Sequence, residues 1–193
     1  VKPDRVLLEM EDVFRGRSFP SVGPVVGQFL HLMCRAVGAR RIFEMGSGFG
    51  YSAMWIAKAM PRDGLIVLTE GDAGNIKQAL GYFEKAGLAG VAQFEQGDAL
   101  KIFEKYPGPF DMIFVDIDKE DYPKAFRAAV PKLRVGGLLM ADNVWWHGAV
   151  ADAADQSADT RAIREFTRLI HETPGLVTSI FPVRDGVSVS LKL

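Results

Sequence analysis

Acidic and amide side chains follow two apolar segments that are typical of buried strands. Asp116 ends the segment 110–116, and Asp142 and Asn143 stand at the end of the segment 137–142. Because open α/β sheets bind ligands beyond the carboxyl ends of their strands, we expect these side chains to converge on one point. A single aspartate at a strand end is usually a solvated cap, but two such ends at one edge favour a metal site. Oxygen ligands without thiolate or imidazole indicate magnesium, and also suit manganese or calcium, while disfavouring zinc.

Lys119 follows the first of these acids by three residues and can reach the same point from its loop. A lysine beside a bound cation is pushed towards its neutral form, in which it can act as a base. The alternative is an ordinary solvated loop charge. Trp146 is a candidate apolar wall for a flat aromatic substrate. Trp145 is equally well explained by packing, and a lone loop histidine such as His147 is more often not a ligand.

A glycine-rich turn, GSGFG at 46–50, directly follows the apolar segment 41–45 and precedes a helical pattern. Glycines in this context let the backbone approach a ligand closely. Glu44 precedes the turn by two residues and would repel a pyrophosphate but attract a cationic ligand. Glu70 closes the next strand segment, where an acid can accept hydrogen bonds from both ribose hydroxyls. These features favour an adenosyl ligand without phosphate over the alternative of a plain tight turn with a surface glutamate.

The elements that must position these residues alternate in the manner of strand–helix units from residue 40 onward. Strands are predicted at 41–45, 65–70, 91–96, 110–116, 137–142, 176–181 and 186–193. Helices are predicted near 50–60, 75–86, 99–106, 122–133 and 160–172. Only PVRD separates the last two strands, and a parallel return needs a dozen or more residues, so these strands should pair antiparallel.

The fold class predicted from this order is α/β, a Rossmann-like doubly wound sheet of seven strands with an antiparallel C-terminal hairpin and helices on both faces. Two further helices, at 1–17 and 24–37, should precede the core at 40–193, with SFPSVGP between them as a turn or extended strip. We expect residues 1–193 to form a single domain.

Composition narrows the class of protein. Lys and Arg number 23 against 24 Asp and Glu, so no net field exists to hold a polyanion, and nucleic acid is disfavoured as a partner. The single cysteine, Cys34, permits no disulfide within the chain. No apolar run is long enough to cross a bilayer, and the charged start is unlike a signal peptide, so we expect a cytoplasmic protein with no membrane partner.

The motifs resemble those of the cation-dependent O-methyltransferases that use S-adenosylmethionine. This family includes animal catechol O-methyltransferase, plant caffeoyl-CoA O-methyltransferase and many short bacterial relatives. The likeness runs from about Val22 to the end of the chain. Its markers, in order, are VGPVVGQFL (22–30), FEMGSGFGYS (43–52), LTEGD (68–72), GDAL (97–100), FVDIDKEDY (114–122), ADNVWWHG (141–148) and DGVSVSLK (185–192).

The resemblance implies a role for each matching position. It places S-adenosylmethionine against Val22, Glu44, Gly46, Ser47, Ser52, Glu70, Asp98, Ala99 and Asp116, with Ser52 near the methionyl carboxylate. It implies that Asp116, Asp142 and Asn143 hold the divalent cation, and that Lys119 is catalytic. It also suggests a homodimer with contacts through the N-terminal helices.

Departures from the family pattern bear on the acceptor. The chain begins about twenty residues before the cofactor strip and lacks an insertion that plant members use in substrate recognition. We therefore expect a small hydroxylated aromatic, such as a free catechol or another vicinal hydroxyl compound, rather than a CoA thioester. Animal members carry His and Trp where this chain has Ile117 and Asp118, so adenine packing must come from elsewhere.

The sequence thus predicts an S-adenosylmethionine-dependent and divalent-cation-dependent O-methyltransferase. Three alternatives stay open at this point. One is a nicotinamide-dependent oxidoreductase, against which the G-x-G-x-G pattern, Glu44 and the terminal hairpin count. Another is a non-catalytic cofactor-binding or dimerisation module, disfavoured by the intact set of acids and lysine. The third keeps the chemistry but methylates a hydroxylated nucleobase in RNA.

Overall fold

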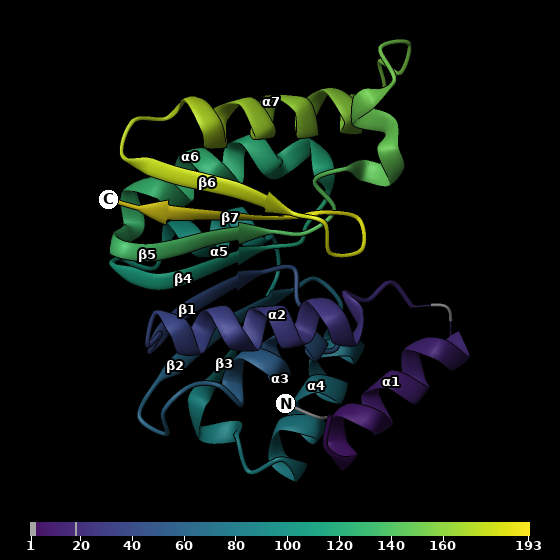
Figure 1. Ribbon diagram of the computed structural model, residues 1–193. Coiled ribbons are helices and arrows are strands. Elements are labelled where there is room, and N and C mark those ends of the chain that lie inside the picture. The colour runs from purple at the N-terminus through teal and green to yellow at the C-terminus, as the bar shows by residue number, and fades with distance from the viewer. Residues whose placement is uncertain (1–2, 18) are drawn as a thin grey trace.

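A computed structural model describes residues 3–17 and 19–193. Seven strands form one sheet in the order β3-β2-β1-β4-β5-β7-β6 (Figure 1). The strands are β1 (Arg41–Met45), β2 (Leu65–Glu70), β3 (Ala92–Gln96), β4 (Phe110–Val115), β5 (Leu133–Ala141), β6 (Leu176–Phe181) and β7 (Val187–Lys192). Pairs among β1 to β5 are parallel, whereas β7 runs antiparallel to both β5 and β6. The predicted fold class, including the terminal hairpin, is confirmed.

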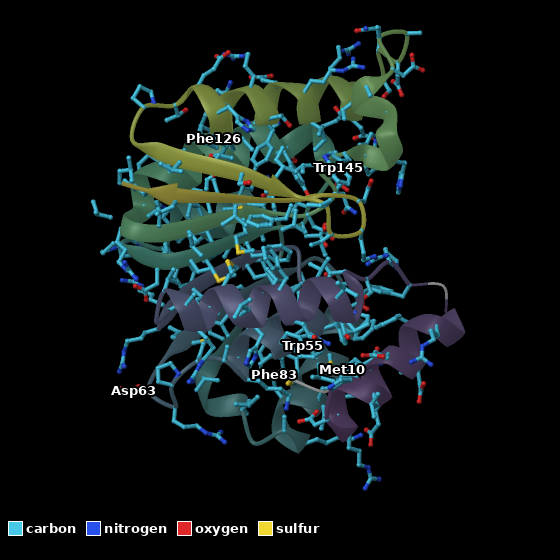
Figure 2. All side chains as sticks on the ribbon, viewed as in Figure 1. Met10, Trp55, Asp63, Phe83, Phe126 and Trp145 are labelled. Atoms are coloured by element: carbon cyan, nitrogen blue, oxygen red, sulfur yellow. The ribbon has the colours of Figure 1, made fainter. Side chains whose placement is uncertain are left out.

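Helices cover both faces of the sheet. They are α1 (Arg5–Arg17), α2 (Gly23–Ala36), α3 (Tyr51–Ala57), α4 (Ala73–Lys85), α5 (Ala99–Glu104), α6 (Tyr122–Lys132) and α7 (Ala158–Glu172), with short 3-10 turns η1 (Ala89–Val91), η2 (Lys119–Asp121) and η3 (Trp146–Ala151). Alternation along β1 explains the two layers, because Ile42 packs in the cluster with α1 to α4 and Phe43 in the cluster with α5 to α7. Figure 2 labels Met10, Trp55 and Phe83 from the first layer.

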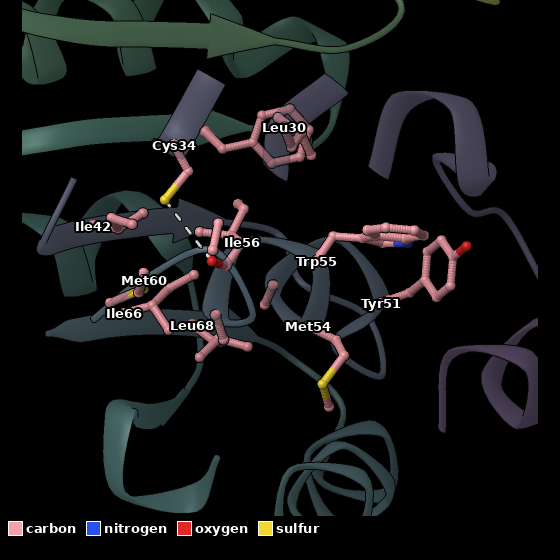
Figure 3. Packing of buried hydrophobic residues seen from close by; sticks show 14 of the residues in the cluster. Leu30, Cys34, Ile42, Tyr51, Met54, Trp55, Ile56, Met60, Ile66 and Leu68 are labelled. Carbon is pink, nitrogen blue, oxygen red and sulfur yellow. Dashed lines mark hydrogen bonds between the residues drawn. The ribbon is translucent and has the colours of Figure 1, made fainter. Parts of the chain in front are cut away.

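Helix α3 is anchored on all sides, which matters because its first turn borders the site described below. All seven of its residues are buried. Helix α2 crosses it at Gly27, where an added β-carbon would lie 2.3 Å from the Trp55 ring, so only glycine permits this approach. Cys34 of α2 contacts the Ile56 carbonyl oxygen at 3.8 Å (Figure 3). The α2–α3 pair therefore forms a rigid support.

The connections that follow β1 and β4 leave on opposite faces of the sheet. Strand β1 leads to α3 in the first layer, and β4 leads to α6 in the second, although the two strands are neighbours. Their carboxyl ends therefore open a crevice, as expected where the winding of an open α/β sheet reverses. Side-chain caps fix the helices that start beside it, since Asp72 and Asp98 accept hydrogen bonds from the backbone N–H groups of Asn75 and Lys101.

Three local features differ from the sequence expectations. Strand β5 begins at Leu133 rather than 137, because Arg134 binds Asp111 and the Val37 carbonyl and so holds a segment without a strand-like sequence pattern beside β4. The strip expected at 18–24 is shorter, since α2 already begins at Gly23, and residue 18 lies outside the described residues. The turns η1, η2 and η3 have no counterpart among the predicted elements. None of the described helices is long and apolar enough to span a membrane.

Candidate functional site

A cavity of about 820 Å³ opens at the carboxyl ends of the parallel strands. Figure 2 shows Trp145 at this edge of the molecule and Asp63 at the opposite edge. The cavity is lined by every residue that the sequence assigned to a site except Glu44, namely Val22, Gly46, Ser47, Ser52, Glu70, Asp98, Ala99, Asp116, Lys119, Asp142, Asn143 and Trp146. The predicted convergence of distant segments on one cleft is therefore what the structure shows.

The glycine-rich turn brings β1 against the end of β4. Gly46 has φ +81° and lies so close to Asp116 that an added β-carbon would be 2.2 Å from that residue's carbonyl oxygen. Both the conformation and the space require glycine there. The turn is also tied to β2, because the N–H groups of Gly46 and Ser47 donate to the Thr69 hydroxyl and carbonyl at 3.1 and 2.9 Å. The ligand-facing backbone is thus fixed before any ligand binds.

Glu44 lies behind this turn instead of on the cavity wall. Its side chain is fully buried, and neither carboxylate oxygen has a hydrogen-bond partner. Burial raises its pKa to about 7, although the nearby Ser52 and Ser47 hydroxyls act in the opposite direction. A buried carboxylate without partners is a costly arrangement that a nearby positive charge would relieve.

Glu70 ends β2 at the cavity with one oxygen already used. Its Oε1 accepts hydrogen bonds from the Asp72 N–H at 2.9 Å and the Asn75 amide at 3.3 Å. The other oxygen, Oε2, accepts no hydrogen bond from the described residues. It can therefore accept one from a ligand hydroxyl without breaking an existing hydrogen bond. Asp98 and Ala99 follow β3, where Asp98 caps α5 through Oδ1 at 3.0 Å from the Lys101 nitrogen. Three strand ends thus supply one side of the cavity.

The acidic pair lies on the other side. Asp142 is only 2% exposed, and its Oδ1 has no hydrogen-bond partner. Burial raises the pKa of Asp142 to about 7, and the Asp116 carboxylate adds to this rise. Burial also raises the pKa of Asp116, against the effect of the Lys119 ammonium. A buried and a partly exposed carboxylate that resist ionisation together have the charge and the donor atoms that fit a hard cation.

The donor set is small. No group of three or more His, Cys, Asp or Glu side chains suited to a metal ion occurs within residues 3–17 and 19–193. The third candidate donor is the amide of Asn143, which adopts a left-handed conformation at φ +55°. Its nitrogen donates weakly to Asp185 at 3.5 Å. Two carboxylates and one amide oxygen leave open positions for water or substrate, as the sequence suggested.

Lys119 is buried, so the alternative of a solvated loop charge is wrong. It is 7% exposed and its Nζ donates to the Tyr122 hydroxyl at 2.7 Å, to Asp116 Oδ1 at 3.2 Å and to the Ile117 carbonyl at 3.3 Å. The ammonium also lies 5.8 Å from the centre of the Trp146 ring. It is therefore held between the acidic pair and the aromatic wall.

Sequence reasoning missed several residues around this arrangement. Tyr122 is buried, and its hydroxyl accepts from Lys119 while donating to the Asp142 carbonyl at 2.9 Å, which joins the two strand ends. Tyr122 follows Lys119 by three residues, and this spacing could have indicated from the sequence that the two side chains are in contact. Arg184 lines the cavity from the loop between β6 and β7. Asp185 in the same loop accepts from the His147 N–H at 2.8 Å, and it stood within a marker motif.

The sheet order, the antiparallel last strand and the cleft beside the glycine-rich turn define a Rossmann-like methyltransferase domain. Comparison with known proteins agrees. The family described as O-methyltransferase matches residues 13–193. The caffeoyl-CoA O-methyltransferase of parsley, Petroselinum crispum, is 32% identical over 179 residues, covering 86% of this chain and 74% of the relative. The catechol O-methyltransferase of Niastella koreensis is 36% identical over 154 residues, covering 78% and 70%.

Solved structures give the same result. The O-methyltransferase TomG from Streptomyces achromogenes, involved in tomaymycin synthesis and solved in complex with S-adenosylmethionine, has a TM-score of 0.91 and 32% identity, covering 100% of this chain and 91% of its own. An O-methyltransferase from Bacillus cereus, solved with S-adenosylhomocysteine, has a TM-score of 0.91 and 29% identity, covering 100% and 93%. The chain belongs to this family of S-adenosylmethionine-dependent O-methyltransferases, and the predicted enzyme class is confirmed.

Proposed function

We propose that this enzyme transfers a methyl group to one of two neighbouring hydroxyls on a small aromatic acceptor, and that the reaction depends on a divalent cation. The observation that carries this proposal is the buried, unpartnered oxygen of Asp142, which lies in one cavity with Asp116 and Lys119. A carboxylate in that state needs a positive partner. The parsley and Niastella relatives, named for caffeoyl-CoA and catechol, support the acceptor chemistry.

The side of the cavity formed by β1 to β3 suits the cofactor. Glu70 has a free oxygen for the ribose hydroxyls, and Asp98 and Ala99 lie at the next strand end. The remaining contacts for the methionyl part would come from Val22, Gly46, Ser47, Ser52 and Asp116. S-adenosylmethionine supplies the methyl group as a sulfonium cation, and the buried charge of Glu44 stands behind the same turn.

The opposite side suits the cation and the acceptor. Asp116, Asp142 and Asn143 would hold magnesium, or manganese or calcium, through oxygen atoms. When bound, the cation supplies Lewis acidity and a template for two neighbouring hydroxyl oxygens. Trp146 lines the same end of the cavity and offers its face to an aromatic ring.

In its neutral form, which a bound cation would favour, Lys119 would receive the hydroxyl proton. Its nitrogen is held by Tyr122 and Asp116, so it has little freedom to leave the site. Burial in a site that excludes water favours a reaction in which an anion and a cation give neutral products. Lys119 therefore acts as base or as the charge that stabilises the developing oxyanion. The alternative acceptor, a hydroxylated nucleobase in RNA, has no additional support, since the near-neutral composition offers no net positive charge for a polyanion.

We also propose that the enzyme is a homodimer. Helix α2 exposes Val25 and Leu32, which are 60% and 58% exposed and lie on one helix face. Light scattering would show a mass near twice 21.2 kDa. A monomeric mass at micromolar concentration would contradict this part of the proposal, independently of the chemistry.

Chelation and one substitution test the proposed chemistry together. Methylation of 3,4-dihydroxybenzamide should stop in excess EDTA and return with magnesium or manganese. Asp142→Ala should abolish turnover while changing S-adenosylhomocysteine affinity only modestly, because Asp142 is assigned to the cation. A matched control is Asp63→Ala, which removes an exposed acid at the opposite edge. Full activity in EDTA would refute cation dependence, and loss of cofactor affinity equal to the loss of rate would refute the role of Asp142.

A further inference from the structure

Left-handed backbone conformations outside glycine gather at one end of the cavity. Within residues 3–17 and 19–193, the non-glycine residues with positive φ are Asn143, Trp146, His147 and Arg184, at φ between +47° and +56°. All four line the cavity. This conformation costs a residue with a β-carbon about 1–2 kcal/mol. Strain confined to one wall of a cavity is typical of a functional constraint, and Arg184 has the longest side chain of the four.

The loop that carries Arg184 packs against the loop after β5. The N–H groups of Val144 and Trp145 donate to the carbonyls of Gly186 and Asp185 at 3.1 and 3.0 Å. These bonds place Arg184 beside the segment that holds Asn143 and Trp146. Its positive charge also acts on both Asp116 and Asp142. The loop that carries Arg184 therefore borders the acceptor end of the cavity.

The guanidinium of Arg184 is largely free to bind. One nitrogen, Nη1, donates to the Ser21 carbonyl at 2.5 Å. No carboxylate among the described residues lies within 4.0 Å of it in an ion pair, and the side chain is exposed. A guanidinium has five N–H donors, so several stay available. Lys119, the cavity's other cationic side chain in the described chain, already donates to three acceptors.

We propose that Arg184 binds a carboxylate of the acceptor, so that the preferred substrate is a hydroxylated aromatic acid. This inference rests on the proposed function and names the substrate class for the same site. The ring lies against Trp146, the neighbouring hydroxyls meet the acidic pair, and the acid group meets Arg184. The bond to Ser21 holds the guanidinium in place, which reduces the side-chain entropy lost on binding. Planar guanidinium and carboxylate groups form paired hydrogen bonds, which gives selectivity over an uncharged group.

A second carboxylate could compete for the same arginine. Ser21 precedes Val22, which is assigned to the methionyl part of the cofactor, so Arg184 stands near both ends of the cavity. One observation favours the acceptor, namely that Arg184 is packed through its loop onto the segment of Asn143. Affinity for S-adenosylhomocysteine separates the two sources, because it carries only the cofactor's carboxylate.

The experiment compares 3,4-dihydroxybenzoate with its uncharged isostere 3,4-dihydroxybenzamide. The measured quantity is the ratio of kcat/KM for the acid to kcat/KM for the amide. Intrinsic differences in reactivity between the two compounds cancel when this ratio is compared between variants. Arg184→Gly removes the guanidinium and suits φ +49°, so the fold is not put at risk. This variant should lower the ratio by about 10- to 100-fold, the range for hydrogen bonds to a charged group, mainly through KM. Arg184→Lys should retain part of the preference.

The matched control is Arg62→Gly. Arg62 is also an exposed loop arginine that donates to a backbone carbonyl, that of Gly87, but it does not line the cavity. Its variant should keep the wild-type ratio. An unchanged ratio in Arg184→Gly would overturn the proposal. Equal losses for both acceptors, together with weaker binding of S-adenosylhomocysteine, would also overturn it and assign Arg184 to the cofactor.

Calorimetry keeps this test separate from the proposed reaction. Binding of the benzoate and the benzamide is measured on the protein saturated with S-adenosylhomocysteine in magnesium buffer, where no methyl transfer occurs. Wild-type protein should bind the benzoate more tightly by about 10-fold or more, and Arg184→Gly should lose this difference. If neither compound is methylated but this pattern holds, the proposed function fails and the role of Arg184 stands. Equal binding of the two compounds to the wild type would refute the proposed role of Arg184 and leave the proposed methyl transfer unaffected.

Discussion

Replacing Glu44 with glutamine should stabilise the ligand-free protein at pH 8 while weakening its affinity for the cofactor. The Glu44 carboxyl is fully buried without hydrogen-bond partners, and its pKa is raised from 4.5 to about 7, chiefly by burial. Ionising it therefore costs the folded state about 3 kcal/mol relative to the unfolded chain, at 1.36 kcal/mol for each tenfold change in acidity. Glutamine has a similar shape and avoids this cost at every pH.

The sign of the pH dependence follows from proton binding. Between pH 4.5 and about 7 the folded state holds the Glu44 proton more tightly than the unfolded chain, so the free energy of unfolding falls as the pH rises through this window. Above it the penalty is constant. Urea unfolding should therefore show Glu44→Gln close to wild type at pH 5 and about 3 kcal/mol more stable at pH 8. Groups that titrate in both proteins cancel in the difference.

A control with the opposite sign is Glu95→Gln. A hydrogen bond from the Tyr106 hydroxyl lowers the pKa of Glu95, so its ionised form stabilises the protein above pH 4.5, and this effect is lost as the pH falls. Its variant should be less stable than wild type at pH 8. Calorimetry with S-adenosylmethionine, which carries the sulfonium charge that S-adenosylhomocysteine lacks, should show weaker binding to Glu44→Gln. Stability curves of wild type and Glu44→Gln that stay parallel from pH 5 to 8 would refute this reasoning.

Substitutions at three further positions test the two sides of the cavity. Glu70→Ala should weaken S-adenosylhomocysteine binding by about 1.5–3 kcal/mol in calorimetry, and unchanged affinity would move the ribose contact elsewhere. Lys119→Ala should lower turnover at neutral pH about 100-fold with little change in cofactor affinity, and Lys119→Arg should not rescue it, because a guanidinium keeps its proton. Near-normal turnover of the arginine variant would limit Lys119 to positioning. Tyr122→Phe should lower the free energy of unfolding by about 1–3 kcal/mol and also slow turnover, since its hydroxyl joins Lys119 to the Asp142 carbonyl. If urea unfolding and initial rates of Tyr122→Phe match those of the wild type, the Tyr122 hydroxyl positions neither Lys119 nor Asp142.

Much of the site could be predicted because strand ends in a parallel sheet meet at one edge. Asp116 and Asp142 could be paired from the sequence, since each closes an apolar strand and the two strands proved to be neighbours. The glycine-rich turn could be recognised from its place between a strand and a helix. The sequence assigned Glu44 to the cofactor contacts, but alternation along β1 places its side chain behind the turn instead of on the cavity wall.

Other features depend on contacts between distant segments, which periodicity does not reveal. The burial of Lys119 results from Tyr122 on the following helix and from the wall formed by Trp146. The turn η3 has no hydrophobic pattern, and its left-handed residue His147 is held by a hydrogen bond to Asp185. The position of Arg184 depends on the packing of the β6–β7 loop against the loop after β5. Its local sequence therefore gave no indication that it lines the cavity.

The reversal of winding between β1 and β4 separates the two tasks of the enzyme along the chain. Most of the proposed cofactor contacts lie after β1, β2 and β3, whereas the proposed acceptor contacts lie after β4 and β5 and between β6 and β7. Asp116, at the end of β4, is the residue assigned to both. New acceptors can therefore be sought by exchanging two segments, 144–157 and 182–186, without altering the proposed cation ligands or the turns proposed to bind the methyl donor. One part of the cavity can thus be kept constant while the other is varied, and Asp116 is the residue common to both parts.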